Sequence, residues 1–256
     1  MADFAHTITL EQDGFVARLT FSSDHPANVF TLPMLEVMAK HVDSLNPAST
    51  RVLVIEGKPT IFSGGADLQS ILDMDAATYR AYVETEYALF RAIETLPFVS
   101  LAILRGSCVG NAAEIALACD LRIAADDVRI GWPEVHVGFV APAQRLARFV
   151  GIGTAKEILF TGRLLKADQA RALGLLTSVV PAAEVDAAAA KVIEQMAGRA
   201  PVSVRVTKGA LERAYSFPPE NPGLEVEAAA ESYDTLDFRE GATSILERRA
   251  PIFQGR

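Results

Sequence analysis

The sequence contains no long apolar run, no basic cluster and no N-terminal targeting segment. No stretch approaches the roughly 20 apolar residues that span a bilayer, and the opening "MADFAHTITLEQDG" lacks the basic and apolar regions of a signal peptide. Lys and Arg total 24 against 32 acidic residues, which gives a net charge of −8. These features argue against membrane and nucleic-acid partners and predict a cytoplasmic protein.

Cysteine and histidine are scarce. The two cysteines, Cys108 and Cys119, are too far apart for a C-x-x-C motif and too few for a disulfide framework, so we expect buried, reduced thiols. The four histidines form no H-x-x-x-H or H-E-x-x-H pattern, so no metal site is expected. The G-x-S-x-G and G-x-x-x-x-G-K-[ST] motifs are also missing, which argues against an α/β serine hydrolase and a phosphate-binding loop.

The chain does contain enough apolar sequence for a large domain. Hydrophobic residues make up 50% of its 256 residues. Two alternating runs around Asp13-Gly14 predict a β-hairpin at the start of the fold. A helix is predicted after Thr31, with Pro33 in its first turn, and the apolar segment "RVLVIEG" that follows predicts a buried strand.

A pattern of strand, glycine-bearing loop and helix then occurs twice. It appears at "VLVIEG…FSGGADL" and again at "VSLAILRGSCVGNAAEIAL". A long helix from about Ala76 to Thr95, stopped by Pro97, is predicted between the two. The pattern predicts parallel βαβ units and an α/β fold, and mostly helical segments follow from about Pro142.

Both glycine-bearing loops run from a strand into a helix, where the first backbone N–H groups have no intrahelical acceptor. Two such helix starts that converge would bind an oxyanion. The N–H groups of Ala66 and Asn111 are the donors that we expect, because each lies where its loop becomes a helix. Each loop taken separately is more simply explained as a turn.

Two glutamates near these loops are the candidate acid and base. Glu114 lies one turn into the second helix, and Glu134 follows Pro133 beside the single tryptophan. Two carboxyl groups in different surroundings, one protonated and one ionised, could perform acid–base chemistry. Local sequence alone favours a structural role for Glu114, as the partner of Asn111 in a capping box, and allows Glu134 to be only a partner of a helix dipole.

Several longer segments extend these observations along nearly the whole chain. In order they are "HPANVFT", "FSGGADL", "GSCVGNAAEIALACDLRIAA", "PEVHVG" followed by "QRLARFVG", "FTGRLLKADQARALGLLTSVVP" and "DFREGATSILERRAPIFQG". Together they resemble the enoyl-CoA hydratase/isomerase, or crotonase, family. The resemblance implies an α/β fold with a crotonase-like β-β-α spiral core and its acyl-CoA site over residues 1–195. It also implies a C-terminal helical oligomerisation region over residues 196–256, in a homotrimer or a dimer of trimers.

The resemblance also assigns roles to the candidate residues. It implies that a thioester carbonyl lies between the N–H groups of Ala66 and Asn111. In an enoyl-CoA hydratase, Glu114 would deprotonate a water and Glu134 would deliver a proton to the α-carbon. No separate cofactor is implied, because CoA is part of the acyl-CoA substrate. The implied CoA-binding residues are Pro26, Ala27, Gly65, Ala66, Asp67, Leu68 and Arg248.

Two departures from the family pattern keep other functions open. Asn111 carries a side chain where the family usually has glycine, and only "FVAPA" separates Gly138 from Gln144, a shorter connection than usual. The alternatives are a double-bond isomerase or a hydrolase that acts on an acyl-CoA, and a CoA-binding oligomer with little catalysis.

Overall fold

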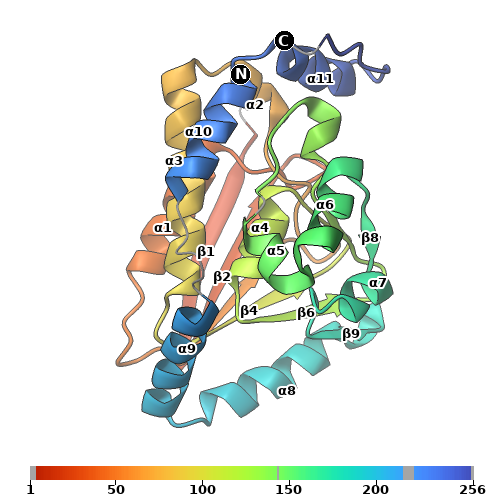
Figure 1. Cartoon of the computed structure of the whole chain (residues 1–256). Helices are drawn as coiled ribbons and strands as arrows, with labels where there is room; N and C mark the ends of the chain where they lie inside the picture. Colours follow the sequence, from red (N-terminus) through yellow and green to blue (C-terminus); the bar gives the residue numbers. More distant parts are fainter. Residues whose placement is uncertain (1–3, 143, 216–221, 255–256) are drawn as a thin grey trace.

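A six-stranded sheet lies at the centre of the computed structural model, which describes residues 4–142, 144–215 and 222–254. The strand order is β1-β2-β3-β4-β6-β9. Helices pack around this sheet (Figure 1). The strands are β1 (His6–Asp13), β2 (Val16–Ser23), β3 (Val52–Glu56), β4 (Val99–Leu104), β6 (Leu121–Ala125) and β9 (Ser178–Val180).

Strands β1 and β2 form the expected hairpin. Their antiparallel pairing runs from Asp13 opposite Val16 to His6 opposite Ser23. Gly14 in the turn has a φ of 54°, a conformation that glycine adopts readily. Partly exposed and buried residues alternate along β2, as expected for a strand that turns one face to the core.

The remaining strands of this sheet are parallel to their neighbours. The parallel pairs are β2 with β3, β3 with β4, β4 with β6, and β6 with β9. Strands β3 and β4 are almost fully buried, as expected for parallel strands that are covered on both faces. The predicted βαβ arrangement is therefore confirmed.

A second sheet of three short strands supports the loops that the sequence analysis singled out. It consists of β5 (Ser107–Val109), β7 (Arg129–Gly131) and β8 (Leu165–Lys166). Strand β5 pairs in parallel with β7, and β7 pairs antiparallel with β8. This sheet therefore places the segment that follows β5 beside the one that follows β7.

Several helices begin at residues that the sequence marks as starts. Helix α1 (Leu32–Asp43) follows Thr31, and α3 (Ala76–Glu94) follows Asp75, whose side chain accepts a hydrogen bond from the N–H of Thr78 at 2.7 Å. The other helical elements are α2 (Leu68–Leu72), α4 (Asn111–Ala118), η1 (Glu134–Val137), α5 (Gln144–Val150), α6 (Ile152–Thr161), α7 (Ala167–Ala172), η2 (Ala182–Glu184), α8 (Val185–Ala197), α9 (Pro201–Tyr215), α10 (Pro222–Tyr233) and α11 (Leu236–Leu246).

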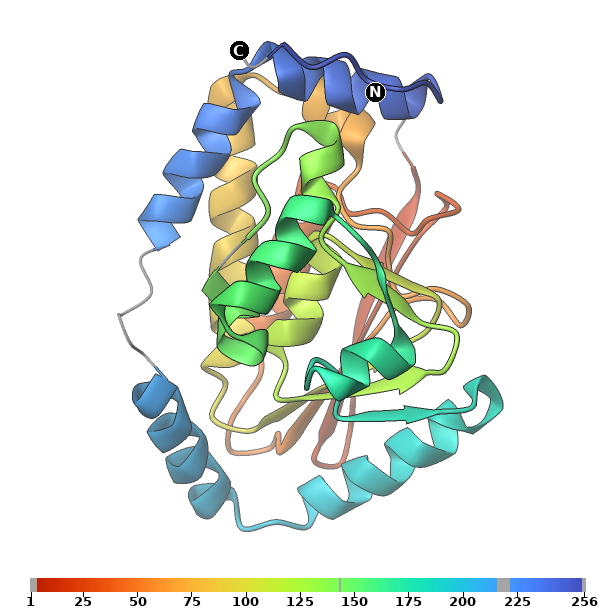
Figure 2. The same cartoon turned by 45° about the vertical axis from the view of Figure 1, so that its right-hand side comes forward.

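Helices α10 and α11 return to the core after α8 and α9 have run along its border (Figures 1 and 2). The expected division between residues 195 and 196 falls inside α8, so one helix crosses that position. Helix α10 contacts α3, and α11 contacts η1. Tyr233 stacks on Tyr79 of α3 with ring centroids 4.1 Å apart, and its hydroxyl lies 3.1 Å from the carbonyl oxygen of Ile71. The C-terminal helices therefore pack directly against the elements near the candidate site.

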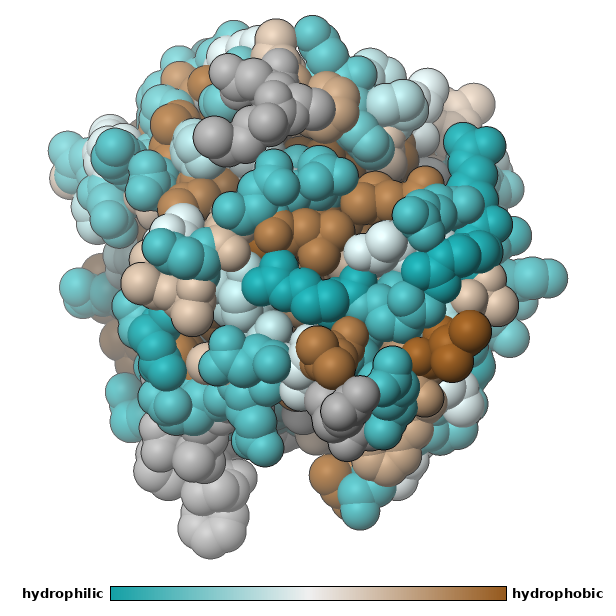
Figure 3. Space-filling model, turned by 90° about the horizontal axis from the view of Figure 1, so that it is seen from above, coloured by the Kyte–Doolittle hydropathy of each residue, from teal (hydrophilic) through white to brown (hydrophobic). Residues whose placement is uncertain are grey.

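The end of the molecule that carries α11 displays separate hydrophobic groups among hydrophilic residues (Figure 3). Within the described ranges, none of the helices combines the length and the apolarity needed to cross a membrane. Large exposed hydrophobic side chains on α9 and α11 are Val202, Val206, Leu211, Leu236, Ile245 and Leu246.

Gly241 of α11 provides a test of this packing. A Cβ at this position would lie 2.5 Å from the carbonyl carbon of Val137 in η1. Gly241→Ala should therefore lower the free energy of unfolding by about 1–3 kcal/mol, the usual range for overpacking. Gly209→Ala in α9 is the matched control, because its Cβ would approach only the end of the Arg213 side chain.

The control should raise the free energy of unfolding by roughly 0.5–1 kcal/mol, since alanine is favoured over glycine inside a helix. Urea unfolding curves of both variants provide the measurement. Equal stability of the two variants would contradict the close packing of α11 on η1.

Candidate active site

Backbone hydrogen bonds join the two glycine-bearing loops. The N–H of Ser63 donates to the carbonyl of Ser107 at 2.8 Å, and the N–H of Val109 donates to the carbonyl of Ser63 at 3.1 Å. Ser63 and Cys108 form an isolated parallel bridge between the loops. The structure therefore brings together two segments that lie far apart in the sequence.

Two glycines make this close approach possible. Gly65 has a φ of 97°, and a Cβ there would lie only 2.7 Å from the carbonyl oxygen of Val109. Gly110 has a φ of 61° and directly precedes α4. Both conformations strongly favour glycine, and the missing Cβ of Gly65 allows the first loop to approach Val109 of the second.

The N–H groups of Ala66 and Asn111 are available as donors, as the sequence predicts. Phe30 pairs with the residues on either side of Ala66, because its N–H donates to Gly65 and its carbonyl accepts from Asp67. Asn111 is the first residue of α4 and has no intrahelical acceptor for its N–H. Within the described parts of the chain, neither of these two N–H groups donates a hydrogen bond to the protein.

Asp67 has a structural role at the start of α2. Its side chain accepts a hydrogen bond from the backbone N–H of Ser70 at 3.3 Å and another from the Ser70 hydroxyl. Such a cap satisfies one of the free donors at the start of a helix. The expectation that Asp67 contacts CoA is therefore not supported by its side chain, which faces its own helix.

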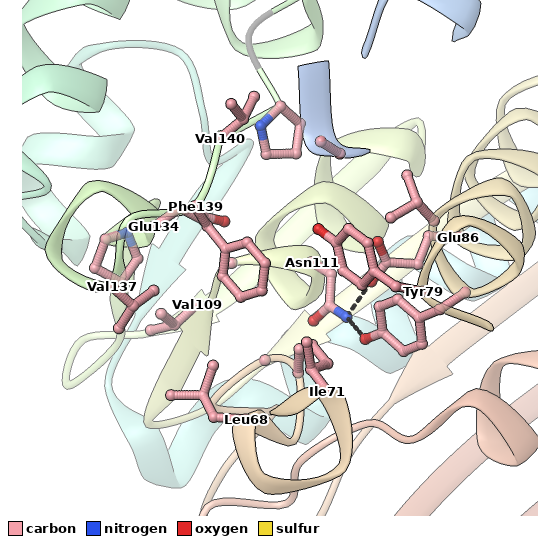
Figure 4. Close-up of a pocket in the computed structure, with 18 of the residues that line it drawn as sticks. Leu68, Ile71, Tyr79, Glu86, Val109, Asn111, Glu134, Val137, Phe139 and Val140 are labelled. Carbon is pink, nitrogen blue, oxygen red and sulfur yellow. Dashed lines mark hydrogen bonds between the residues drawn. The ribbon is translucent and has the colours of Figure 1, made fainter. Parts of the chain in front are cut away.

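A cavity of about 270 Å³ lies at the junction of the loops (Figure 4). Ala66 and Asn111 line it, together with residues of α3, η1, α10 and α11. Most of the other lining side chains are apolar. They include Leu68, Ile71, Tyr79, Tyr82, Val83, Tyr87, Val137, Phe139 and Val140. Of the short connection after Gly138, residue 143 lies outside the described residues.

Among the described residues, Glu134 is one of two carboxylates that line this cavity. It begins η1 after Pro133, and its Oε1 lies 3.3 Å from the place that a Cβ on Gly110 would occupy. Burial raises the pKa of Glu134 to about 8, although a hydrogen bond from its own N–H acts against this, and the negative charges of Glu114 and Glu86 raise it further. The raised pKa favours the protonated form of Glu134 at neutral pH.

The structure places Glu114 outside the cavity lining. Its side chain is fully buried, its Oε1 accepts a hydrogen bond from Trp132 Nε1 at 2.7 Å, and its Oε2 accepts one from Arg145 at 2.5 Å. The capping box expected from local sequence is also absent, because Gly110 rather than Asn111 is the N-cap and Glu114 binds elsewhere. Both of its oxygens are thus held by other side chains.

Arg145 at the start of α5 links two buried glutamates. Its Nε donates to Glu94 Oε1 at 2.7 Å, while a terminal nitrogen donates to Glu114. Burial disfavours the charged guanidinium, but the two carboxylates outweigh this and raise the pKa of Arg145 above its ordinary value. The result is a buried ion-pair cluster that joins α3, α4 and α5.

Glu86 of α3 is the second carboxylate among the described residues that line the cavity, and it is not one of the residues expected from the sequence. The side-chain amide of Asn111 donates to Glu86 Oε1 at 2.5 Å and to the hydroxyl of Tyr82 at 2.9 Å (Figure 4). Burial raises the pKa of Glu86 to about 7, while the hydrogen bonds to Asn111 and Tyr82 act in the opposite direction. The Asn111 side chain therefore connects the start of α4 to this carboxylate.

The sequence does contain a signal for Glu86. Tyr79, Tyr82, Val83, Glu86 and Phe90 recur at the spacing of one helix face. The other four residues of this helix face are hydrophobic and buried, so Glu86 is its one charged side chain. A charged residue on the apolar face of an amphipathic helix is uncommon unless it is paired.

Only some of the remaining expected CoA contacts line the cavity. Gly65 and Leu68 line it, whereas Pro26, Ala27 and Arg248 do not. Ala27 is nevertheless adjacent to the first loop, because its carbonyl accepts a hydrogen bond from the N–H of Gly64 at 2.7 Å. Arg248 is exposed after α11.

Replacing Arg145 tests the buried ion-pair cluster. Arg145→Met would leave two buried carboxylates without their cation, so we expect the free energy of unfolding to fall by about 3–5 kcal/mol. Arg163→Met is the matched control, because Arg163 pairs with Glu157 at the surface, where both side chains are exposed. The control should change the free energy of unfolding by less than about 1 kcal/mol.

Urea unfolding at neutral pH measures both arginine variants. A loss as small for Arg145→Met as for Arg163→Met would show that the cluster does not stabilise the folded protein.

Comparison with known proteins places these features in a family. The sequence model of the enoyl-CoA hydratase/isomerase family matches residues 11–256. A short-chain-enoyl-CoA hydratase of Clostridium acetobutylicum is 30% identical over 251 residues, which cover 95% of this chain and 96% of that protein.

Solved structures agree with the sequence match. An enoyl-CoA hydratase from Mycobacterium avium subsp. paratuberculosis K-10 has a TM-score of 0.88 at 26% identity, over 96% of this chain and 98% of the other. A putative enoyl-CoA hydratase from Thermobifida fusca YX in complex with acetoacetyl-CoA has a TM-score of 0.76 at 30% identity, over 88% and 92% of the two chains. The expected crotonase-like α/β fold with a helical C-terminal region is confirmed, and the chain belongs to the enoyl-CoA hydratase/isomerase family.

Proposed function

We propose that the protein is an enoyl-CoA hydratase that adds water across the double bond of a 2-enoyl-CoA. The observation that carries this proposal is that Ala66, Asn111 and the carboxyl group of Glu134 line one largely apolar cavity. The N–H groups of Ala66 and Asn111 would hold the thioester oxygen as negative charge develops on it. Donors fixed in advance in a site that excludes water stabilise such an anion strongly.

Glu134 would supply the proton for the α-carbon. As a neutral carboxylic acid it can donate this proton when the enolate forms, and its raised pKa keeps it neutral near pH 7. Its location beside Gly110 places its carboxyl next to the start of α4, where Asn111 would bind the thioester oxygen. Acid and oxyanion donors thus act on neighbouring atoms of one substrate.

The cavity favours an apolar acyl group. Aliphatic and aromatic side chains form most of its lining. Its volume of about 270 Å³ lies just below the usual range for small-molecule pockets, roughly 300–1,000 Å³, so it suits the acyl and thioester part of a substrate rather than a whole acyl-CoA. We assign the CoA part to the surface near Pro26, Ala27 and Arg248, outside this cavity.

We also propose a homotrimer or a dimer of trimers as the working assembly. The exposed hydrophobic side chains on α9 and α11 support self-association, because burying them in an interface would remove apolar surface from water. A closed symmetric assembly is the usual outcome when copies of one chain associate.

The hydration of crotonyl-CoA tests the role of Glu134. The loss of absorbance of the conjugated thioester should be rapid with the unchanged protein, and Glu134→Gln should lower kcat/KM by about 10²–10⁴-fold, because the amide cannot donate this proton. Thermal unfolding of the variant controls for folding. An active Glu134→Gln variant would contradict the proposed role.

The same assay has an expected pH dependence. Glu134 has a raised pKa of about 8, so its acid form is lost as the pH rises through 8. We therefore expect kcat/KM for hydration to fall above about pH 8, approaching tenfold per pH unit, as for a reaction that needs one protonated group. A flat profile from pH 7 to pH 9.5 would argue against Glu134 as the acid.

A double-bond isomerase is the second candidate. The observation in its favour is that Arg145 and Trp132 hold Glu114, so the expected second carboxylate does not reach the cavity. Isomerisation needs only one group that removes and returns a proton, and the ionised form of Glu134, which becomes more populated as the pH rises toward its raised pKa, could do both. Conversion of a 3-enoyl-CoA into the conjugated 2-enoyl-CoA without later hydration would favour this candidate.

A further inference from the structure

We propose that Glu86 is a catalytic residue of the hydration reaction, and that its carboxylate removes a proton from the water that attacks the β-carbon. This inference rests on the proposed hydratase function and names the base that the function requires. Hydration needs an ionised group to accept the proton of the water, besides the acid that serves the α-carbon. Among the described residues that line the cavity, Glu86 and Glu134 are the carboxylates.

The geometry connects Glu86 to the thioester site through a single side chain. Asn111 offers its backbone N–H for the oxyanion, and its side-chain amide donates to Glu86 at 2.5 Å. In Figure 4, Asn111 lies between Glu86 on one side and Glu134 on the other. A substrate bound at the Asn111 N–H would therefore lie between the two carboxyl groups, as a reaction that adds groups to adjacent carbons requires.

The hydrogen-bond donors around Glu86 and Glu134 differ, and this difference indicates which carboxyl group acts as base and which as acid. The amide of Asn111 and the hydroxyl of Tyr82 donate hydrogen bonds that favour the ionised form of Glu86. Glu134 has no such side-chain donor, and its Oε2 has no hydrogen-bond partner within the described structure. Burial raises the pKa of both groups, but hydrogen-bond donors lower that of Glu86 whereas Glu134 has no such side-chain donors, so we assign Glu86 as the base and Glu134 as the acid.

The charged groups around Glu86 agree with this division. The negative charge of Glu114 raises the pKa of Glu86. Arg145 neutralises part of that charge through its ion pair with Glu114. Tyr79 and Tyr82 remain neutral at all relevant pH values, because burial raises the pKa of both hydroxyls.

The proposed step balances in atoms and charge. The water oxygen bonds to the β-carbon, and the released proton goes to the Glu86 carboxylate. The electrons of the double bond move toward the thioester, and the resulting enolate takes the proton of Glu134 at the α-carbon. Afterwards Glu86 is protonated and Glu134 is ionised, and exchange with solvent after product release restores both groups.

The substitution Glu86→Gln separates this role from a structural one. The glutamine carbonyl can still accept the hydrogen bond from Asn111, so the oxyanion loop keeps its support while the base is lost. We expect kcat for crotonyl-CoA hydration to fall by about 10²–10⁴-fold with little change in KM. Glu84→Gln is the matched control, because Glu84 lies on the exposed face of the same helix.

A second measurement isolates the chemistry at the α-carbon. Exchange of the α-protons of butyryl-CoA with D₂O, followed by mass spectrometry, requires Glu134 and the oxyanion donors but no attacking water. Glu86→Gln should retain this exchange, whereas Glu134→Gln should lose both exchange and hydration. If the unchanged protein performs neither reaction, the proposed hydratase function fails, whatever the role of Glu86.

Two outcomes would overturn the assignment of Glu86 alone. One is hydration by Glu86→Gln at the unchanged rate, especially if Glu114→Gln folds normally and has lost hydration. The other is an equal loss of exchange and hydration in a folded Glu86→Gln protein, which would mean that Glu86 only positions Asn111.

The pH profile gives an independent test of the same role. With Glu86 as base, kcat/KM of the unchanged protein should rise with pH up to about 7, the pKa of Glu86, before it falls near 8. Tyr82→Phe removes a hydrogen bond that favours the ionised carboxylate, so the rising limb should move to higher pH. An unmoved rising limb in this variant would contradict the assignment.

Discussion

The guanidinium of Arg145 is the interaction on which the site depends most. It binds Glu94 of α3 and Glu114 of α4 from the start of α5, so one buried cation fixes three helices around the cavity. Removing such a cation leaves two carboxylates that water cannot reach, which is far less favourable than losing a surface pair. The same contact directs Glu114 away from the cavity, so it determines which carboxylates can meet a substrate.

The side chains of Asn111 and Glu86 satisfy each other's hydrogen-bonding requirements. A carboxylate on the apolar face of α3 needs a hydrogen-bond donor, and an amide at the start of α4 needs an acceptor. The side-chain amide of Asn111 donates to Glu86 Oε1 at 2.5 Å, and it also donates to the hydroxyl of Tyr82 at 2.9 Å. The departure of Asn111 from the glycine of the family pattern is therefore part of a polar cluster inside the cavity.

Most of the fold, and the backbone part of the site, could be predicted from the sequence. The hairpin around Gly14, the parallel strands and the helix starts follow from local patterns, and Ala66 and Asn111 could be placed because helix starts expose N–H groups. The orientation of the Glu114 side chain could not be predicted. Its partners Trp132 and Arg145 lie 18 and 31 residues further along the chain, and local sequence patterns do not show which distant residues meet in the folded protein. The spacing along α3 places Glu86 on the apolar face of the helix, but only the packing of α3 against α4 brings it to Asn111.

The contacts of α10 and α11 have a consequence for how the protein is made. Ala229 of α10 and Ile245 of α11 line the cavity, and α11 packs against the η1 helix that carries Glu134. The loops and glutamates on the other side of the cavity are all encoded earlier in the chain. During synthesis, the enclosed cavity therefore cannot form until α11 has left the ribosome, so a nascent chain that already contains every proposed catalytic residue still lacks a complete pocket.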